Sequence, residues 1–199
     1  MSTPICAFIV SAHSRPVELN LCLLSLVCQS FPDWVAIVTD NSDSSTYRDL
    51  NFEVVTRLND RRISYAHTGS SCPSCYHSAE VGAALVPVNA PWLAFPSDDS
   101  YLCPDFLERM AQNSEDIDLL YCDVLYDRRL TGKRDVLRVR PHVGFVDKTS
   151  FMVRREKFIG FPDKRQDGLP CVADGAAIER MVSLGYRHCR VDECLVVHS

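Results

Sequence analysis

Three short apolar runs, none alternating with polar residues, divide the first half of the chain. They cover residues 5–10, residues 34–39 and a segment that begins at Trp92. A short apolar run bounded by polar turn residues is typical of a strand that is buried on both faces. Between the first two runs, residues 16–29 carry leucines on several sides of a helical period and begin with Pro16, which suits a first helical turn. The pattern predicts a strand–helix–strand unit and hence a parallel sheet.

The alternation of helical and extended segments continues toward the C-terminus. The predicted helices cover residues 76–86, 105–112 and 174–184. The predicted strands cover residues 52–56, 63–66, 117–124, 186–191 and 195–197, and a hairpin is expected around residues 130–133. Because no repeat, low-complexity tract or linker interrupts this order, one α/β domain over residues 1–199 is predicted.

Composition and charge narrow the class of protein. The 199 residues are 46% apolar and 24% charged, as in ordinary globular proteins, and the net charge of −5 argues against a dedicated nucleic-acid binder. No run approaches the roughly 18 apolar residues of a membrane span, and the first residues do not resemble a signal peptide. Several of the ten cysteines lie in apolar segments, so we expect reduced thiols and a cytoplasmic protein.

Acidic residues follow the predicted strands. Asp98 and Asp99 come directly after the run that begins at Trp92, and Asp40 ends the run before it. Open α/β sheets bind ligands beyond the carboxyl ends of their strands, and carboxylates hold the hard cations that accompany phosphates. The pattern therefore indicates a site for a metal–diphosphate, although paired loop aspartates that are merely solvated explain the residues equally well.

Several strings, taken in order, resemble the family 2 glycosyltransferases. The first three are IVSAHSRP at residues 9–16, LSLVCQS at residues 24–30 and WVAIVTDNSD at residues 34–43. The stretch WLAFPSDDS at residues 92–100, followed by PDFL at residues 104–107, is similar to the family's acidic metal motif and the helix after it. Asp174 with the helix after it, LGY at residues 184–186 and His198 are similar to its closing elements.

This resemblance implies a GT-A fold, a Rossmann-like three-layer α/β/α sandwich around a mostly parallel sheet. It implies that residues 1–100 bind the nucleotide and residues 101–199 face the acceptor. It also implies transfer of a sugar, with inversion, from a nucleotide-sugar that is usually UDP-linked. The acceptor would be a glycan, a lipid-linked molecule or a small molecule. Because the chain is short for that family, a second copy is one way to complete the acceptor pocket.

The resemblance also assigns roles to residues. Those that would border the nucleotide-sugar are Ser11, Ala12, Arg15, Asp40 and Asp98, with Asp40 accepting from the base. Those that would hold Mn²⁺ or Mg²⁺ are Asp98, Asp99 and His198, with His198 an extra ligand. Asp174 would be the general base that deprotonates the acceptor hydroxyl.

The chain departs from the family pattern at three places. Ser100 stands where the acidic triplet usually ends, which leaves open whether Asp98 or Asp99 is the main ligand. Ala173 precedes Asp174 where an acid is common, so the sequence gives Asp174 no acidic neighbour to raise its pKa. Asn41 and Ser42 replace the commoner acid–glycine pair. An inactive nucleotide-sugar-binding or scaffold protein on the same fold is therefore an alternative.

Other constellations point to other chemistry. His67, Cys72, Cys75 and His77 have zinc-like spacing, with a redox pair or incidental loop cysteines as alternatives. Basic residues crowd the predicted hairpin between Arg128 and Arg140, which suits an anionic acceptor or simply a solvated loop. A nucleotidyltransferase would use similar carboxylates, but the loop from Ser11 to Arg15 lacks the glycines that such an enzyme would want.

Overall fold

The computed structural model describes residues 4–69, 74–86, 89–128, 131–162 and 172–199. Helices and strands alternate through most of the described chain. In chain order they are β1 (Cys6–Ala12), α1 (Pro16–Val27), β2 (Trp34–Asp40), α2 (Ser45–Leu58), β3 (Ile63–His67), α3 (Cys75–Leu85), β4 (Trp92–Ala94), β5 (Ser100–Leu102), α4 (Phe106–Gln112), β6 (Leu119–Arg128), β7 (Lys133–Leu137), η1 (Lys148–Ser150), β8 (Phe151–Arg154), η2 (Arg155–Lys157), α5 (Ala173–Ser183) and β9 (His188–His198).

One continuous sheet joins all the strands of the described residues, in the order β3-β2-β1-β4-β8-β6-β9-β5, with β7 paired to β6. The strands β3, β2, β1 and β4 are parallel, as predicted for the first half. The prediction of a mostly parallel sheet is confirmed only in part, because the rest is mixed: β8 runs antiparallel to both β4 and β6, whereas β9 is parallel to β6. Parallel neighbours need a long crossover that usually contains a helix, and α5 lies in the connection that leads to β9.

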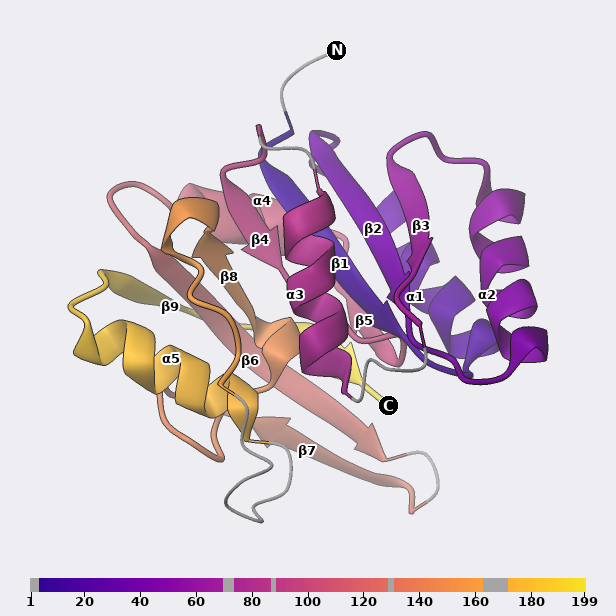
Figure 1. Cartoon of the computed structure of the whole chain (residues 1–199). Helices are drawn as coiled ribbons and strands as arrows, with labels where there is room; N and C mark the ends of the chain where they lie inside the picture. The colour runs from indigo at the N-terminus through magenta and orange to yellow at the C-terminus, as the bar shows by residue number, and fades with distance from the viewer. Residues whose placement is uncertain (1–3, 70–73, 87–88, 129–130, 163–171) are drawn as a thin grey trace.

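Helices cover both faces of the sheet (Figure 1). The helices α3 and α5 lie in front of it in this view, and α1 and α4 lie behind it. On the front face α3 packs on β1 and β2, whereas α1 packs against α2 and β5. The layered arrangement agrees with the predicted sandwich, although the sheet within it is mixed and curled.

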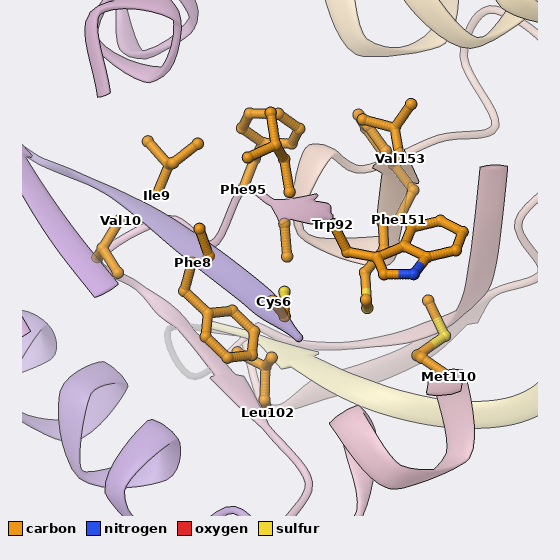
Figure 2. Packing of buried hydrophobic residues seen from close by; sticks show 14 of the residues in the cluster. Cys6, Phe8, Ile9, Val10, Trp92, Phe95, Leu102, Met110, Phe151 and Val153 are labelled. Atoms are coloured by element: carbon orange, nitrogen blue, oxygen red, sulfur yellow. The ribbon is translucent and has the colours of Figure 1, made fainter. Parts of the chain in front are cut away.

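Apolar side chains from both faces of β1 form the core. Successive residues of a strand point to opposite faces, and Figure 2 shows Phe8 turned toward Leu102 while Ile9 lies on the other side with Phe95. Phe8 contacts the Trp34 ring edge-on, with ring centroids 6.0 Å apart. All five side chains are buried. This packing holds the β1 strand, and with it the loop that follows β1, in a fixed position.

A glycine brings α3 close to the sheet. A Cβ atom at Gly82 would lie 2.4 Å from Cγ2 of Ile9 and 2.9 Å from Cγ2 of Thr39. Real Cβ atoms do not approach other carbons so closely, so only glycine lets the helix pack at this distance. The first turn of α3 is thereby held beside the carboxyl ends of β1 and β2.

Two element predictions are wrong. Residues 52–56 are not a strand but part of α2, an amphipathic surface helix that ends at Asn59 in a left-handed cap. The two strands predicted over residues 186–191 and 195–197 are one strand, β9, whose irregular pairing with β6 at Cys122–Val124 absorbs the polar interruption. The predicted hairpin is confirmed, since β6 and β7 pair antiparallel and Gly132 has a φ of +66° in the turn between them. Arg129 and Leu130 lie outside the described residues.

No helix in the described parts of the chain is both long and apolar enough to cross a membrane.

Candidate functional site

A cavity of about 220 Å³ opens at the carboxyl edge of the sheet, where β1 and β2 end, low in Figure 1. Four chain segments and the start of α3 supply its walls. The lining residues are Ser11, Ala12, His13, Arg15, Asn41, Cys75, Ser97, Asp98, Asp99 and His198. Of the residues predicted to bind nucleotide or metal, the structure thus brings together Ser11, Ala12, Arg15, Asp98, Asp99 and His198.

Backbone pairing joins the acidic segment to the end of β1. The N–H of Ser11 donates to the Pro96 carbonyl, and the N–H of Asp98 donates to the Ser11 carbonyl, both at 3.0 Å. Ser97 thereby forms an isolated parallel bridge with Ser11, beyond the end of β4. The N–H of His13 then donates to Asp98 Oδ2 at 2.8 Å. The position of the Asp98 carboxylate is therefore set by main-chain geometry.

The loop after β1 turns back over the two acids. Ser14 has a φ of +51°, a left-handed conformation that is uncommon for a residue other than glycine. The turn is held by a 2.9 Å hydrogen bond from the Ser14 N–H to Ser42 Oγ. The next residue, Arg15, places its Nη1 against Asp99 Oδ2 and 3.6 Å from Asp98 Oδ1. Pro16 then starts α1.

The two acids differ in their surroundings. Burial raises the pKa of Asp98 to about 6, and the neighbouring charge of Asp99 adds to the rise, against the hydrogen bond from His13. Asp99 Oδ1 is a buried oxygen without a hydrogen-bond partner among the described residues. An unpaired buried carboxylate oxygen is costly unless a cation or donor meets it.

Pairing between β5 and β9 brings the end of the chain to the acids. Ser100 faces His198 in the ladder, and the Ser100 hydroxyl lies 3.1 Å from His198 Nδ1. The same imidazole nitrogen is 3.9 Å from Asp99 Oδ1 and 3.5 Å from an Asp147 oxygen. His198 is thus beside the acid pair, as the resemblance implies, and shares a network with Asp147.

Asp147 and Lys148 are buried residues of the site that carried no recognisable signal in the sequence. Asp147 accepts from the Tyr126 hydroxyl and from the Thr149 N–H, each at 2.8 Å. Lys148 donates from Nζ to Ser11 Oγ at 2.8 Å. Neither belongs to a motif, and both reach the site because η1, which Asp147 caps, packs against β6 and β9.

Asp174 lies in the first turn of α5 and is not among the residues that line the cavity, but the charges of Asp147 and Lys148 act on it. Burial raises its pKa to about 6, and the negative charge of Asp147 adds to the rise. The expectation that Asp174 has no acidic neighbour is therefore wrong, because the fold supplies Asp147 from a distant segment. A Cβ at Gly175 would lie 2.7 Å from Val143 Cα, so this glycine allows the helix start to pack closely.

Asp40 ends β2 but does not line the cavity. Its side chain is fully buried and accepts hydrogen bonds from the Ser42 N–H, the Asn51 amide and the Tyr65 hydroxyl, at 2.8, 3.0 and 2.7 Å. The residue that lines the cavity at this strand end is its neighbour Asn41. Asp40 thus shapes the β2–α2 turn from behind the cavity wall.

The other candidate chemistry is not assembled in the described parts of the chain. No group of three or more His, Cys, Asp or Glu side chains there is arranged to hold a metal by itself. His67 Nε2 lies 3.2 Å from the Ser42 carbonyl oxygen, and His77 Nδ1 lies 3.8 Å from Glu80 Oε2. Cys72 is outside the described residues. In the hairpin segment, Arg134 pairs with Asp127.

Comparisons with known proteins identify the fold. No protein-family model and no curated protein matches the chain. A mannosyltransferase from Pyrobaculum calidifontis, in complex with GDP-Man and Mn²⁺, superposes with a TM-score of 0.77 at 13% identity, over 100% of this chain and 57% of that one. TarS 1–349 from S. aureus, in complex with UDP-GlcNAc, superposes with a TM-score of 0.72 at 15% identity, over 96% of this chain and 57% of that one.

A third similar solved structure is a synthase rather than a glycosyltransferase. The 4-diphosphocytidyl-2C-methyl-D-erythritol synthase from Anaerococcus prevotii gives a TM-score of 0.64 at 10% identity, over 96% of this chain and 87% of that one. The chain thus spans less than two thirds of the mannosyltransferase and TarS chains, and most of the synthase. Likeness at this level of identity shows the fold, and the chain has the GT-A type of α/β fold.

Proposed function

We propose that the protein is a glycosyltransferase that takes a sugar from a nucleotide-sugar. The observation that carries the proposal is the meeting of Asp98 and Asp99 around one cationic position in the cavity, which the Arg15 guanidinium fills. The position lies beyond the carboxyl ends of parallel strands, where open α/β sheets bind nucleotides. The shared fold with a mannosyltransferase that binds GDP-Man supports the same class of donor.

The two acids also fit a divalent cation. Mn²⁺ and Mg²⁺ are held in such sites by one or two carboxylates, with phosphate oxygens and water completing the shell. Asp99 Oδ1, buried and without a hydrogen-bond partner among the described residues, is an oxygen of this kind. When bound, the cation would supply positive charge to the departing diphosphate. Asp98 and Asp99 would hold it, and His198, close to Asp99, is the proposed extra ligand.

The proposed reaction inverts the anomeric carbon. The acceptor oxygen forms a bond to that carbon, while the bond from the carbon to the diphosphate oxygen breaks and leaves its electron pair on the diphosphate. The acceptor proton goes to an Asp174 carboxylate oxygen. Because burial and Asp147 raise the pKa of Asp174 to about 6, its carboxylate is mostly ionised at pH 7 yet a stronger base than an ordinary aspartate.

We propose that Ser11, Ala12 and Arg15 contact the nucleotide part of the donor from the loop after β1. Asn41 would contact the nucleobase, and the buried Asp40 would hold the end of β2 in place behind the cavity wall. UDP is the first donor to test because of the sequence resemblance, and GDP the second. The two-part division, with the nucleotide on residues 1–100 and the acceptor on residues 101–199, belongs to the same proposal.

The acceptor proposed is a hydroxyl of a glycan, a lipid-linked molecule or a small molecule. Cys6, Cys22 and Cys122 are buried and carry free thiols. Buried unpaired thiols are usual in reducing compartments, which supports the proposal that the protein works in the cytoplasm.

Nucleotidyl transfer is a second candidate, because the chain spans 87% of a cytidylyltransferase-like synthase chain. The two reactions release different products, so one assay separates them. The purified protein is incubated with UDP- and GDP-sugars, or with CTP and UTP plus a sugar phosphate, and released nucleoside diphosphate and pyrophosphate are measured. Release of UDP or GDP from the nucleotide-sugar that is lost in Asp99→Asn supports glycosyl transfer.

Release of pyrophosphate from a nucleoside triphosphate overturns that proposal in favour of nucleotidyl transfer. Binding of a nucleotide-sugar without turnover with any acceptor or water indicates the third alternative, an inactive nucleotide-sugar-binding protein. The matched control is Asp105→Asn, a carboxylate at the start of α4 whose side chain lies outside the cavity.

A further inference from the structure

Lys148 is a buried cation whose ammonium has a single hydrogen-bond partner among the described residues. Its side chain is only 4% exposed, and it stands at the first position of η1. Its ammonium carries three donors, of which one is used, in the hydrogen bond to Ser11 Oγ. Within the described chain no carboxylate forms an ion pair with it. Burial of a charge without an ion-pair partner is energetically unfavourable, so a lysine here requires an explanation beyond packing.

The ammonium lies directly behind the cavity wall. Its partner Ser11 lines the cavity. The Ser11 hydroxyl donates a hydrogen bond of 3.0 Å to the Cys75 carbonyl, so its oxygen is the acceptor in the hydrogen bond from the Lys148 ammonium. The lysine charge also lowers the pKa values of Asp98 and Asp174, so it acts both on one of the acid pair and on the proposed base.

Two roles are available for a cation in this position. It either balances the fixed carboxylates around it or meets an anion that arrives with a ligand. Balance accounts for part of its charge, because the lysine lowers the pKa values of Asp98 and Asp174, but it leaves two ammonium donors without a hydrogen-bond partner among the described residues. Its two unused donors are buried beside a cavity suited to phosphate, and an ammonium is a common point charge for phosphate.

We propose that Lys148 binds the diphosphate of the nucleotide-sugar donor from inside the protein, as a fixed positive charge in addition to any divalent cation at Asp98 and Asp99. This inference rests on the proposed function. Its consequence is that the free protein retains measurable affinity for diphosphate in the absence of divalent metal.

The test is a set of calorimetric titrations in the presence of a chelator. UDP, GDP and inorganic pyrophosphate are the probes that carry a diphosphate, and uridine and guanosine are the probes that lack it. The variants are Lys148→Met, which removes the charge, and Lys148→Gln, which removes the charge but retains a donor for Ser11. The control is Lys133→Met, which removes the same charge from the exposed strand β7.

We expect both Lys148 variants to bind UDP or GDP at least tenfold more weakly than the wild type, with nucleoside binding unchanged, and the control to bind like the wild type. Equal affinity of wild type and either folded Lys148 variant for the diphosphate probes overturns the inference while leaving the proposed function intact. Failure of the wild type to bind any nucleotide, with or without Mn²⁺, overturns both. Thermal unfolding of each variant identifies those that fold.

Discussion

The backbone N–H of His13 donates a 2.8 Å hydrogen bond to the carboxylate of Asp98, 85 residues further along the chain. The bond joins the loop after β1 to the acidic segment after β4, which the parallel bridge between Ser11 and Ser97 already aligns. Because main-chain groups hold the carboxylate, its position does not depend on a ligand. Such preorganisation is what a site for a charged substrate requires.

Arg15 contacts the acid pair at the position proposed for a divalent cation, so we expect the two to compete. Its guanidinium contacts Asp99 and lies 3.6 Å from Asp98. Because the Arg15 side chain is 53% exposed, the ion pair contributes little free energy and a cation can displace it. We expect Arg15→Gln to tighten Mn²⁺ binding to the nucleotide-free protein by about three- to tenfold, as measured by electron paramagnetic resonance. Arg57→Gln, which removes an exposed helix pair with Glu53, is the control. Unchanged or weaker Mn²⁺ binding in Arg15→Gln would show that the arginine does not occupy the cation position.

Protonation of Asp174 should cause the proposed reaction to slow at low pH. With a pKa of about 6, the carboxyl is protonated at lower pH and cannot accept the acceptor proton. The rate constant kcat/KM should therefore fall about tenfold per pH unit below about pH 6. Asp174→Asn should lower it by roughly 10²- to 10⁴-fold at pH 8. A pH profile that is flat from pH 5 to 8 in the wild type would contradict the assignment of the base.

The Asp174 carboxyl should also make stability depend on pH, in the opposite direction to activity: activity rises with pH, whereas stability falls. An unfolded aspartate loses its proton near pH 4, whereas the folded one keeps it to about pH 6, so Asp174 lowers the free energy of unfolding as the pH rises through this interval. Asp174→Asn lacks the effect. We expect it to melt several degrees above the wild type at pH 8 and at the wild-type temperature near pH 4. An inactive variant that is less stable at every pH would indicate a structural role instead.

Asp40 is predicted to support the structure rather than to select the base. Asp40→Asn should lower the free energy of unfolding by about 1–3 kcal/mol, because asparagine keeps one acceptor oxygen and its amide NH2 must then face either the Ser42 N–H or the donors of Asn51 and Tyr65. The ratio of UDP to GDP affinities should stay unchanged, and it should shift in Asn41→Ala. Tyr65→Phe, which removes one bond of the same network, is the control for stability. A changed ratio in a stable Asp40→Asn protein would restore the role that the sequence resemblance implies.

Gly82 sets the distance between α3 and the sheet. In an open helix position, alanine would stabilise by up to about 1 kcal/mol relative to glycine. At Gly82 the contacts with Ile9 and Thr39 should reverse the sign, with a loss of about 1–3 kcal/mol in denaturant titrations. The double variant with Ile9→Ala should lose less than the sum of the two single variants. Additive losses would mean that the helix moves away without strain.

The sequence predicts the elements where local pattern and tertiary environment agree. The apolar runs that became β1 and β2 are buried on both faces, so their composition alone identifies them. Residues 52–56 contain two valines and a threonine, which favour a strand locally, but their surroundings in the folded protein make them part of α2. The antiparallel course of β8 follows from a connection that contains no crossover helix, and no local pattern reports that course.

The site divides in the same way. Asp98 and Asp99 follow a predicted strand, so their place at the sheet edge is predictable from the sequence. Asp147 and Lys148 are recruited by tertiary packing alone, and they alter the electrostatics of Asp174 in a manner that the sequence around Asp174 does not indicate. Asp40 is the reverse case, a recognisable position whose hydrogen bonds are satisfied within the protein.

The central claim is that the cavity binds a nucleotide diphosphate together with a cation at Asp98 and Asp99. Its most direct test is calorimetric titration of UDP and GDP into the wild type and into Asp99→Asn, with and without Mn²⁺. The account predicts that Mn²⁺ tightens binding of one of the nucleotides at least tenfold in the wild type and has little effect in Asp99→Asn. Absence of nucleotide binding, or the same effect of Mn²⁺ in both proteins, would contradict it.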